Sequence, residues 1–314
     1  MRQVDEDSRG EVWHYTSAAG LKGIIENNYL FACPATQMND SKELHEGRDK
    51  VEQILRERLS DDPRLLDLAL SQIGTFEEIL AESENLFLIS ASTNGDNLSL
   101  WRSYGTSASY AIRFDKSKIL RPIVNPDNLD GRLLREELPG ILLSDPLPHA
   151  AASGSLDWLP VDYTGSSATE LAGMIDSGLR SKDNKEQYAQ HLQDYRSRIL
   201  ARTKHGSFDA ESEVRRIIRL SPPLAFLAFR ETPRGLMRHI RVGYSDFDQP
   251  GRLTTNDGKE LHDCILKPDR LPILEVKLSP TGHLGSAAHS VEYFLRAHGY
   301  GHVRVSKSSS PFIG

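Results

Sequence analysis

Short segments with strand patterns, scattered unevenly between longer helical stretches, constrain the fold of this chain most strongly. The clearest of them are Asn85–Ser92, Ser109–Phe114, Glu213–Leu220 and Ile273–Ser279. They are rich in the β-branched, aromatic and leucine residues that strands bury in a sheet. Strands and helices do not alternate regularly, as they would in a doubly wound parallel sheet. The sequence therefore predicts an α+β fold.

Periodic apolar residues predict the helices between these strands. The expected helices are Ser17–Asn27, Ser41–Leu59, Arg64–Ala81, Ala168–Thr203 and Ser286–His298. Further short strands are expected at Glu11–Tyr15, Leu30–Ala32, Leu159–Tyr163, Leu224–Phe229 and His302–Ser306. Ser17 is the expected N-cap of the first helix, which the pair Asn27-Asn28 ends. The strand Ile273–Ser279, the helix Ser286–His298 and the strand His302–Ser306 are expected to form one strand–helix–strand unit.

Frequent Pro, Gly and Asp residues interrupt the sequence between Arg121 and Ser155. Such residues break helices and strands, so this stretch is expected to be an irregular insertion or a mobile cover. A chain of 314 residues can otherwise form one large domain. We expect a single domain over residues 1–314 with an insertion at 121–155.

Composition favours a cytoplasmic protein without a membrane anchor. Its 44 acidic and 38 basic residues give a formal net charge of -6, which provides no overall attraction to nucleic acid. The two cysteines, Cys33 and Cys264, are too far apart in sequence to suggest a disulfide framework or a zinc knuckle. The chain starts without an apolar signal segment, and no apolar run is long enough to span a membrane.

The common sequence signatures of enzymes are missing from this chain. GxGxxG, Walker, GxSxG, HExxH and CxxC patterns do not occur. His298 and His302 have the spacing of helical metal ligands, but Gly299 and Gly301 between them oppose a helix. No metal site is expected.

Five blocks of sequence carry a resemblance to a known family. They read WHYTSAAGLKGIIENNYLFACPATQMNDSKE, FLISASTNGDNLSLWRSYG, SYAIRFD, SFDAESEVRRI and VRVSKSSSPF, beginning at Trp13, Phe87, Ser109, Ser207 and Val303. Their content and order resemble the bacterial and phage family of domains of unknown function 2971. The chain departs from that family at Met38 and Ser41, where Phe and Pro are usual. These departures bear on the substrate more than on membership.

The layout also resembles, more remotely, that of ADP-ribosyltransferases, especially the bacterial toxins that modify DNA bases. A first strand ends in His14-Tyr15-Thr16, a helix follows, and a glutamate stands on a late strand. The resemblance implies a split β-sheet core with surrounding helices, and NAD as the substrate. It further implies transfer of ADP-ribose to a protein or a nucleic acid, or hydrolysis of NAD.

By this resemblance Glu213 is the catalytic residue. Breaking the bond between nicotinamide and ribose develops positive charge on the sugar, which a fixed carboxylate stabilises. If the chain is extended here, Glu211 faces the same side as Glu213 and can orient or deprotonate the acceptor. Arg215 shares that side, so the alternative is a solvent-exposed ion pair between Arg215 and Glu213.

The same resemblance assigns nucleotide contacts to residues of two strands. His14 would bind the ribose hydroxyls, Tyr15 would lie near the nicotinamide, and Thr16 would help to start the helix. Ser90 and Ser92 would brace the nicotinamide pocket, like the Ser-x-Ser element of these transferases. The competing interpretations are a satisfied core histidine, a helix start and two serines that end a strand.

Three further residues are candidate ligands of the nucleotide. Asn39 stands in a polar loop close in sequence to His14 and would contact an amide or a ribose, although a helix cap nearby is the simpler explanation of that loop. Trp101 and Tyr104 are aromatic residues at helical spacing, and such residues pack in cores more often than they bind ligands.

The favoured function is therefore an NAD-consuming ADP-ribosyltransferase or NAD glycohydrolase, of the kind that acts as a toxin or in phage defence. One alternative is a non-catalytic module that senses a nucleotide or binds a partner. The other is a nuclease that uses His14 with carboxylates as general acid and base.

Overall fold

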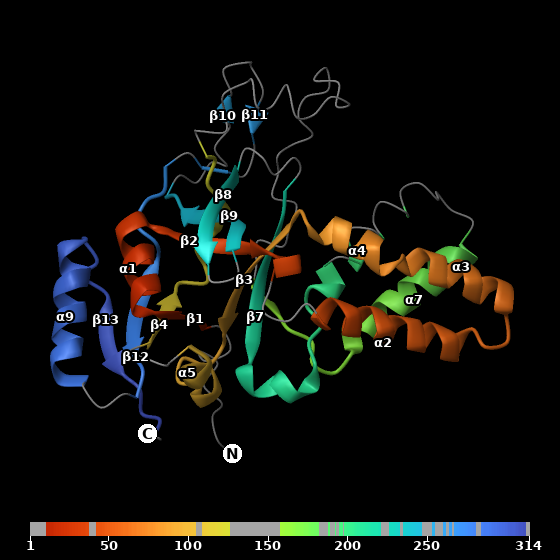
Figure 1. Cartoon of the computed structure of the whole chain (residues 1–314), viewed down its shortest axis with the longest axis horizontal. Coiled ribbons are helices and arrows are strands. Elements are labelled where there is room, and N and C mark those ends of the chain that lie inside the picture. Colours follow the sequence, from red (N-terminus) through yellow and green to blue (C-terminus); the bar gives the residue numbers. More distant parts are fainter. Residues whose placement is uncertain are drawn as a thin grey trace.

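The computed structural model describes residues 11–37, 42–104, 109–125, 158–181, 188, 192, 195–196, 198–220, 226–232, 235–246, 253–254, 260–261, 264–265, 267–280 and 284–311 of the 314-residue chain. Of residues 42–44, 104, 253–254, 260–261 and 284–285 it describes the backbone alone. Within these residues the fold combines several helices with one large, mostly antiparallel sheet (Figure 1). The mixed α and β composition predicted from the sequence is confirmed.

The elements have the following bounds. The strands are β1 (Val12–Ser17), β2 (Tyr29–Pro34), β3 (Leu86–Ser92), β4 (Ser109–Phe114), β5 (Leu120–Pro122), β6 (Leu159–Pro160), β7 (Glu213–Arg219), β8 (Leu227–Thr232), β9 (Gly235–Tyr244), β10 (Leu253–Thr254), β11 (Glu260–Leu261), β12 (Ile273–Leu278) and β13 (Arg304–Lys307). The α-helices are α1 (Ala18–Asn27), α2 (Lys42–Arg58), α3 (Pro63–Ile73), α4 (Phe76–Ser83), α5 (Leu98–Tyr104), α7 (Ser166–Arg180) and α9 (Leu284–Ala297). Short 3-10 helices cover Ala35–Gln37 and Gly206–Glu211.

The main sheet has the strand order β13-β12-β4-β1-β3-β2-β9-β5. In addition, β7 pairs with β3, β6 with β7, and β8 with β9. Among the strand pairs described, only β12 and β13 run parallel. β1 and β3 meet at one register position, Trp13 opposite Ser92, whereas β7 pairs with β3 along its whole length. Continuous pairing is therefore interrupted between β1 and β3.

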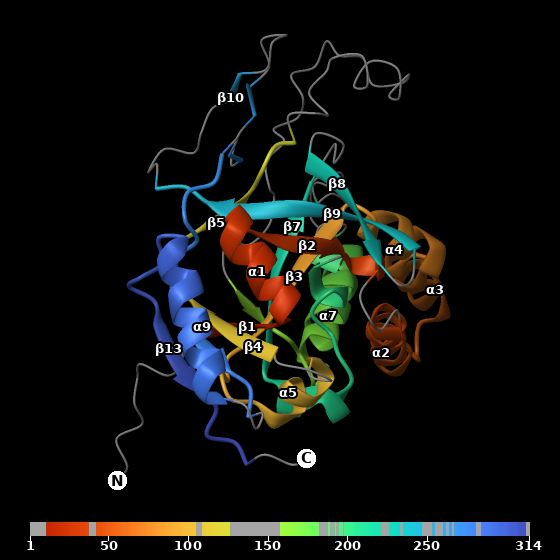
Figure 2. The same cartoon turned by 60° about the vertical axis from the view of Figure 1, so that its left-hand side comes forward.

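Helices lie on both sides of this sheet. Figures 1 and 2 show α9 beside β13 at one edge, and α2, α3, α4 and α7 gathered at the opposite side of the molecule. The helical group has its own apolar core, which includes Leu55, Ile73 and Ile175. The larger core lies on the sheet and includes Phe87 and Ile112.

The ends of α1 follow the sequence signals closely. The Ser17 hydroxyl accepts a hydrogen bond from the backbone N–H of Gly20 at 3.2 Å, as expected of an N-cap. Asn28 ends the helix in the left-handed conformation, with φ of 58°, which asparagine tolerates better than most residues. Leu21, Ile24 and Ile25 form the buried face. The predicted helix is confirmed.

Several predicted boundaries differ from the structure. The helix expected over Arg64–Ala81 is two helices, because Gly74 (φ 82°) interrupts it and Thr75 caps α4. α7 ends at Arg180, so the helix expected over Ala168–Thr203 is not continuous; the described residues 188, 192, 195–196 and 198–200 are helical again. Part of the strand expected at Leu224–Phe229 lies outside the described residues, and β8 begins at Leu227.

The expected insertion at 121–155 lies mostly outside the described residues. Its first two residues, Arg121 and Pro122, belong to β5 and pair with β9. The regular sheet thus extends into the beginning of that stretch. No helix among the described residues is both long and apolar enough to cross a membrane.

Candidate functional site

His14 is held in one tautomer by the strand beside it. Its Nδ1 lies 2.9 Å from the backbone carbonyl oxygen of Ser90 on β3. A carbonyl only accepts, so Nδ1 carries the hydrogen and donates it. Burial lowers the pKa of His14 below its usual value, although the bond to Ser90 opposes this. The imidazole is therefore neutral at pH 7, and its Nε2 keeps a lone pair that can accept a hydrogen bond.

A cavity of about 530 Å³ opens beside His14. The described residues that line it come from β1, α1, β2, the 3-10 helix Ala35–Gln37, β3, β8 and β9: His14, Tyr15, Thr16, Ala19, Gly20, Gly23, Ile24, Asn27, Tyr29, Leu30, Phe31, Cys33, Gln37, Leu88, Ile89, Ser90, Arg230, Thr232 and Met237. This lining contains one arginine and no carboxylate. The volume of the cavity falls within the range of small-molecule and cofactor sites, about 300 to 1,000 Å³. Among the described residues its lining is mostly apolar, and Arg230 is the one side chain that carries a full charge.

Small residues on α1 keep this cavity open. Ala19 and Gly20 line it about one helical turn before Gly23. A Cβ atom added to Gly20 would overlap the Thr16 hydroxyl at 1.9 Å, whereas one added to Gly23 would meet no atom within 4 Å. Gly20 thus allows α1 to lie close to β1, and Gly23 leaves room in the cavity.

Tyr15 and Trp101 have structural partners. The Tyr15 hydroxyl donates to the carbonyl of Asn94 at 2.8 Å and accepts from the backbone N–H of Asn97 at 2.8 Å. Its ring packs edge-on against Trp101, with 4.7 Å between ring centroids. Burial raises the pKa of Tyr15. Both aromatic side chains are buried and hold residues 93–97, which favours the core interpretation for Trp101.

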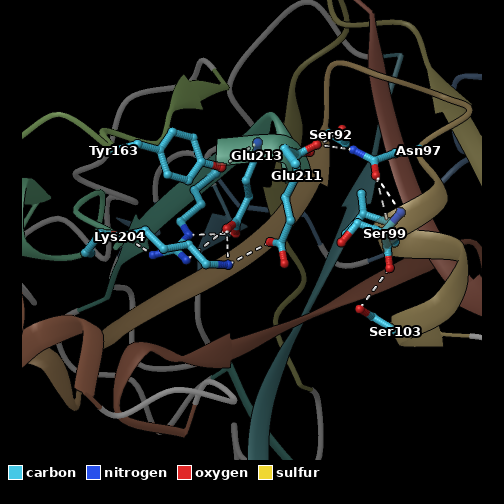
Figure 3. Close-up of polar contacts among 12 residues, drawn as sticks. Ser92, Asn97, Ser99, Ser103, Tyr163, Lys204, Glu211 and Glu213 are labelled. Carbon is cyan, nitrogen blue, oxygen red and sulfur yellow. Dashed lines mark hydrogen bonds and ion pairs between the residues drawn. The ribbon is translucent and has the colours of Figure 1, made fainter. Parts of the chain in front are cut away.

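Glu213 lies in a buried cluster of charges (Figure 3). Its carboxylate accepts from Arg215 Nε at 2.7 Å and from Arg215 Nη2 at 3.1 Å. Lys204 Nζ lies 3.0 Å from Glu213 and 2.7 Å from Glu211. Two carboxylates and two cations thus neutralise one another, and we call these four residues the ion cluster.

The ion cluster keeps Glu213 ionised. Burial alone would raise the pKa of its carboxyl, but Arg215 and Lys204 more than offset this and hold it at about 2. The Tyr163 hydroxyl accepts the backbone N–H of Glu213 at 2.9 Å. The Ser90 hydroxyl lies close enough to help lower this pKa, yet it is buried without a well-formed hydrogen bond to any described residue.

The geometry around Glu211 differs from the predicted strand. Glu211 ends a 3-10 helix, Ser212 has a left-handed φ of 48°, and β7 begins only at Glu213. The carboxylates of Glu211 and Glu213 come together at Lys204, which both of them bind. The alternation of side chains along a strand does not explain this, because Glu211 is not in a strand. Arg215 does pair with Glu213, as the alternative interpretation predicted. The pair is buried, however, so the prediction that it is exposed to solvent was wrong.

The two serines of β3 have different surroundings. Ser90 lines the cavity. The Ser92 hydroxyl donates to the carbonyl of Glu211 at 2.7 Å and accepts from the backbone N–H of Asn94 at 3.0 Å. Ser92 therefore fastens the turn that precedes Glu213, and only Ser90 of the pair borders the cavity among the described residues.

The structure thus divides the predicted residues between two places. His14, Tyr15, Thr16 and Ser90 line the cavity, whereas neither Glu211 nor Glu213 belongs to the described lining. Ser90 stands between the cavity and the ion cluster, because its carbonyl accepts from His14 and its register partner on β7 is Arg215, which pairs with Glu213. Asn39 and the side chain of Tyr104 lie outside the described residues.

Three residues of these sites escaped the sequence interpretation. Lys204 lies three positions before Ser207, the start of the block SFDAESEVRRI, and a lysine before two glutamates was the only signal in the sequence that could have indicated it. Tyr163 and Arg230 stand in no motif, so only folding brings Tyr163 to Glu213 and Arg230 to the cavity.

Among the described residues, no group of three His, Cys, Asp or Glu side chains is placed to hold a metal ion. No protein-family profile matches the chain, and neither a curated protein nor a solved structure matches it significantly.

Proposed function

We propose that this chain binds NAD in the cavity beside His14 and acts as an ADP-ribosyltransferase or NAD glycohydrolase. The observation that carries the proposal is that Ser90 on β3 accepts the hydrogen bond of His14 and lies opposite Arg215 on β7, whose guanidinium holds Glu213. These residues come from distant parts of the sequence and lie on β1, β3 and β7. The interrupted pairing between β1 and β3 also supports a split sheet of the ADP-ribosyltransferase type.

Glu213 has the ionisation state that the proposed reaction needs. Cleavage breaks the bond between nicotinamide N1 and ribose C1′; nicotinamide leaves with the bonding electrons, and the sugar becomes electron-deficient. An anionic carboxylate near the sugar stabilises that charge. A nucleophile of the acceptor, or water, then bonds to C1′ and gives up its proton. Glu211 shares Lys204 with Glu213 and is our candidate to receive it.

A different observation favours a second candidate, a non-catalytic nucleotide-binding module. Both oxygens of Glu213 are engaged by Arg215 and Lys204, and Glu213 is not among the described residues that line the cavity. In such a module the ion cluster would serve the fold alone. A nuclease has less support, because the described lining offers no carboxylate to act together with His14.

Measurement of NAD binding together with nicotinamide release tests the proposal. We expect the wild type to release nicotinamide, and Glu213→Gln to release it about 100-fold more slowly with nearly unchanged NAD affinity. Loss of the transition-state charge, with ground-state contacts kept, is the physical reason. Glu82→Gln is the matched control, since Glu82 also pairs with a buried arginine, Arg196, but does not line the cavity.

The outcomes separate the candidates. Binding without release, in the presence and absence of candidate protein and nucleic-acid acceptors, would leave the module as the function. Absence of binding contradicts both. Thermal unfolding of each variant is needed as a check, because breaking a buried ion pair destabilises a fold by about 3–5 kcal/mol. A role as a toxin or in phage defence belongs to the same proposal and depends on this activity.

A further inference from the structure

Arg230 lies in the wall of the cavity formed by β2, β8 and β9. It stands on β8 and is partly buried. Its guanidinium carbon lies 5.1 Å from the centroid of the Phe31 ring, a cation–π arrangement. Its Nη2 lies 3.5 Å from Cys33 Sγ, which is a weak acceptor. These two contacts hold the guanidinium against the wall without neutralising its charge.

The described residues place no carboxylate within ion-pair distance of Arg230. Arg196, Arg215 and Arg113 each pair with a glutamate. Arg230 makes no such ion pair in the described part of the chain, and its Nε, like those of Arg113 and Arg196, is buried without a hydrogen-bond partner there. A buried, unsatisfied charged donor is costly. The cost is offset if a ligand brings the missing anion.

The surroundings of Arg230 are electrically positive. Arg241 stands on the adjacent strand β9, with its guanidinium carbon 5.7 Å from the Tyr29 ring centroid. His239 lies between the two arginines and stacks edge-on against Phe31. Burial, followed by the charges of Arg230 and Arg241, lowers the pKa of His239 to about 4. His239 is therefore neutral at pH 7, and the positive charge on this side of the sheet comes from Arg230 and Arg241.

We infer that Arg230 forms an anion subsite of the cavity, which binds the phosphate groups of a nucleotide while His14 accepts a hydrogen bond from a ribose hydroxyl. The inference rests on the proposed function insofar as the nucleotide is NAD, whose diphosphate is the anion. A planar guanidinium with several donors suits phosphate oxygens. The cation–π contact with the Phe31 ring positions the guanidinium.

The affinities of Arg230 variants for ligands with and without phosphate test the subsite. For Arg230→Gln we expect the Kd for NAD and for ADP to rise about tenfold or more, because charge-assisted hydrogen bonds are lost. The Kd for adenosine, which has no phosphate, should change by less than about twofold. Arg230→Lys should recover part of the NAD affinity, because the charge remains while the planar fork is lost. Calorimetry or ligand-observed NMR gives these values.

Arg241→Gln is the matched control, since Arg241 lies on the same face but does not line the cavity. An equal loss in Arg241→Gln and Arg230→Gln would overturn the subsite, because a general positive field would then explain both. So would an unchanged Kd for NAD and ADP in Arg230→Gln with the wild-type melting temperature.

Failure of this inference can be distinguished from failure of the proposed function. If the wild type binds ADP and inorganic diphosphate through Arg230 but does not bind NAD, the anion subsite stands and the NAD proposal falls. If NAD binds and Arg230→Gln binds it equally well, the NAD proposal stands and the subsite falls. If no phosphate-bearing probe binds the wild type, the subsite is wrong.

Discussion

Arg215 and Arg230 lie on strands of the same sheet, yet their surroundings give them opposite roles. Arg215 is buried against Glu213, and its Nη1 also donates to the carbonyl of Ala201 at 2.7 Å. Arg230 faces the cavity, and its positive charge has no counterpart among the described residues. The residue type alone cannot distinguish these cases, because pairing depends on which side chains the fold brings within reach.

At the same scale, His239 should make the stability of the protein depend on pH. Its pKa of about 4 in the folded state lies below the ordinary value of about 6.5, so the unfolded chain binds the proton more readily. The free energy of unfolding should therefore fall as the pH drops from about 6.5 towards 4. His239→Gln should reduce this slope, measured as the difference between melting temperatures at pH 7 and pH 5.

The exposed His302 provides the control for that measurement, and His302→Gln should leave the slope as in the wild type. Some slope should remain in His239→Gln, because burial also lowers the pKa of His14. An identical slope in wild type and His239→Gln would contradict the assignment.

At the scale of the element, α1 has a buried apolar face and a second face with glycines beside the cavity. Leu21, Ile24 and Ile25 fix one face in the core, while Gly20 and Gly23 leave space on the cavity side. Glycine in a helix interior costs stability relative to alanine, about 0.5–1 kcal/mol. Gly23 in particular makes no close approach that demands glycine, so its small size fits a role in keeping the cavity open.

A large side chain at Gly23 should therefore block the cavity without disturbing the fold. We expect Gly23→Leu to abolish measurable NAD binding while its melting temperature stays at or above that of the wild type. Gly23→Ala should raise the free energy of unfolding by about 0.5–1 kcal/mol. Calorimetric titration and thermal unfolding of both variants provide the measurements.

Lys22→Leu adds the same side chain one residue away, at an exposed position that does not line the cavity. It should bind NAD like the wild type. Should Gly23→Leu keep NAD affinity within about twofold of the wild type, the ligand would have to bind elsewhere.

Regular patterns predicted the elements better than the turns between them. The pattern EVRRIIRL predicted a strand, and the structure confirms it from Glu213 to Arg219. The residues just before it also read as extended, but Ser212 takes a left-handed conformation and Glu211 ends a 3-10 helix. A single backbone reversal of this kind leaves little mark on periodicity, because it depends on contacts such as Ser92 with the carbonyl of Glu211.

At the scale of the whole molecule, the C-terminal serines fasten the end of the chain to the loop after β3. Asp96 accepts hydrogen bonds from the Ser309 N–H at 2.7 Å, from the Ser310 hydroxyl at 3.1 Å and from Trp101 Nε1 at 2.9 Å. The Ser308 and Ser309 hydroxyls bind the same carboxylate. Burial alone would raise the pKa of Asp96, but these hydrogen bonds lower it well below its usual range.

Removal of this carboxylate should loosen contacts between segments more than 200 residues apart in sequence. We expect Asp96→Ala to lower the free energy of unfolding by about 2–3 kcal/mol, because several donors lose a charged acceptor at once. Denaturant unfolding provides the value. Asp115→Ala is the control, since among the described residues that carboxylate accepts hydrogen bonds from Ser117, two residues away. A similar loss in both variants would show that Asp96 holds no more than a local turn.

The sequence by itself determined the mixed α and β character, most strands, and the start and end of α1. These follow from apolar periodicity, capping residues and short motifs, which act over a few neighbouring residues. Only the tertiary structure decided that His14 donates to Ser90, that Lys204 and Arg215 enclose Glu213, and that Arg230 enters the cavity. Burial and charge pairing depend on contacts between distant segments, and these determine which predicted residues can meet a ligand.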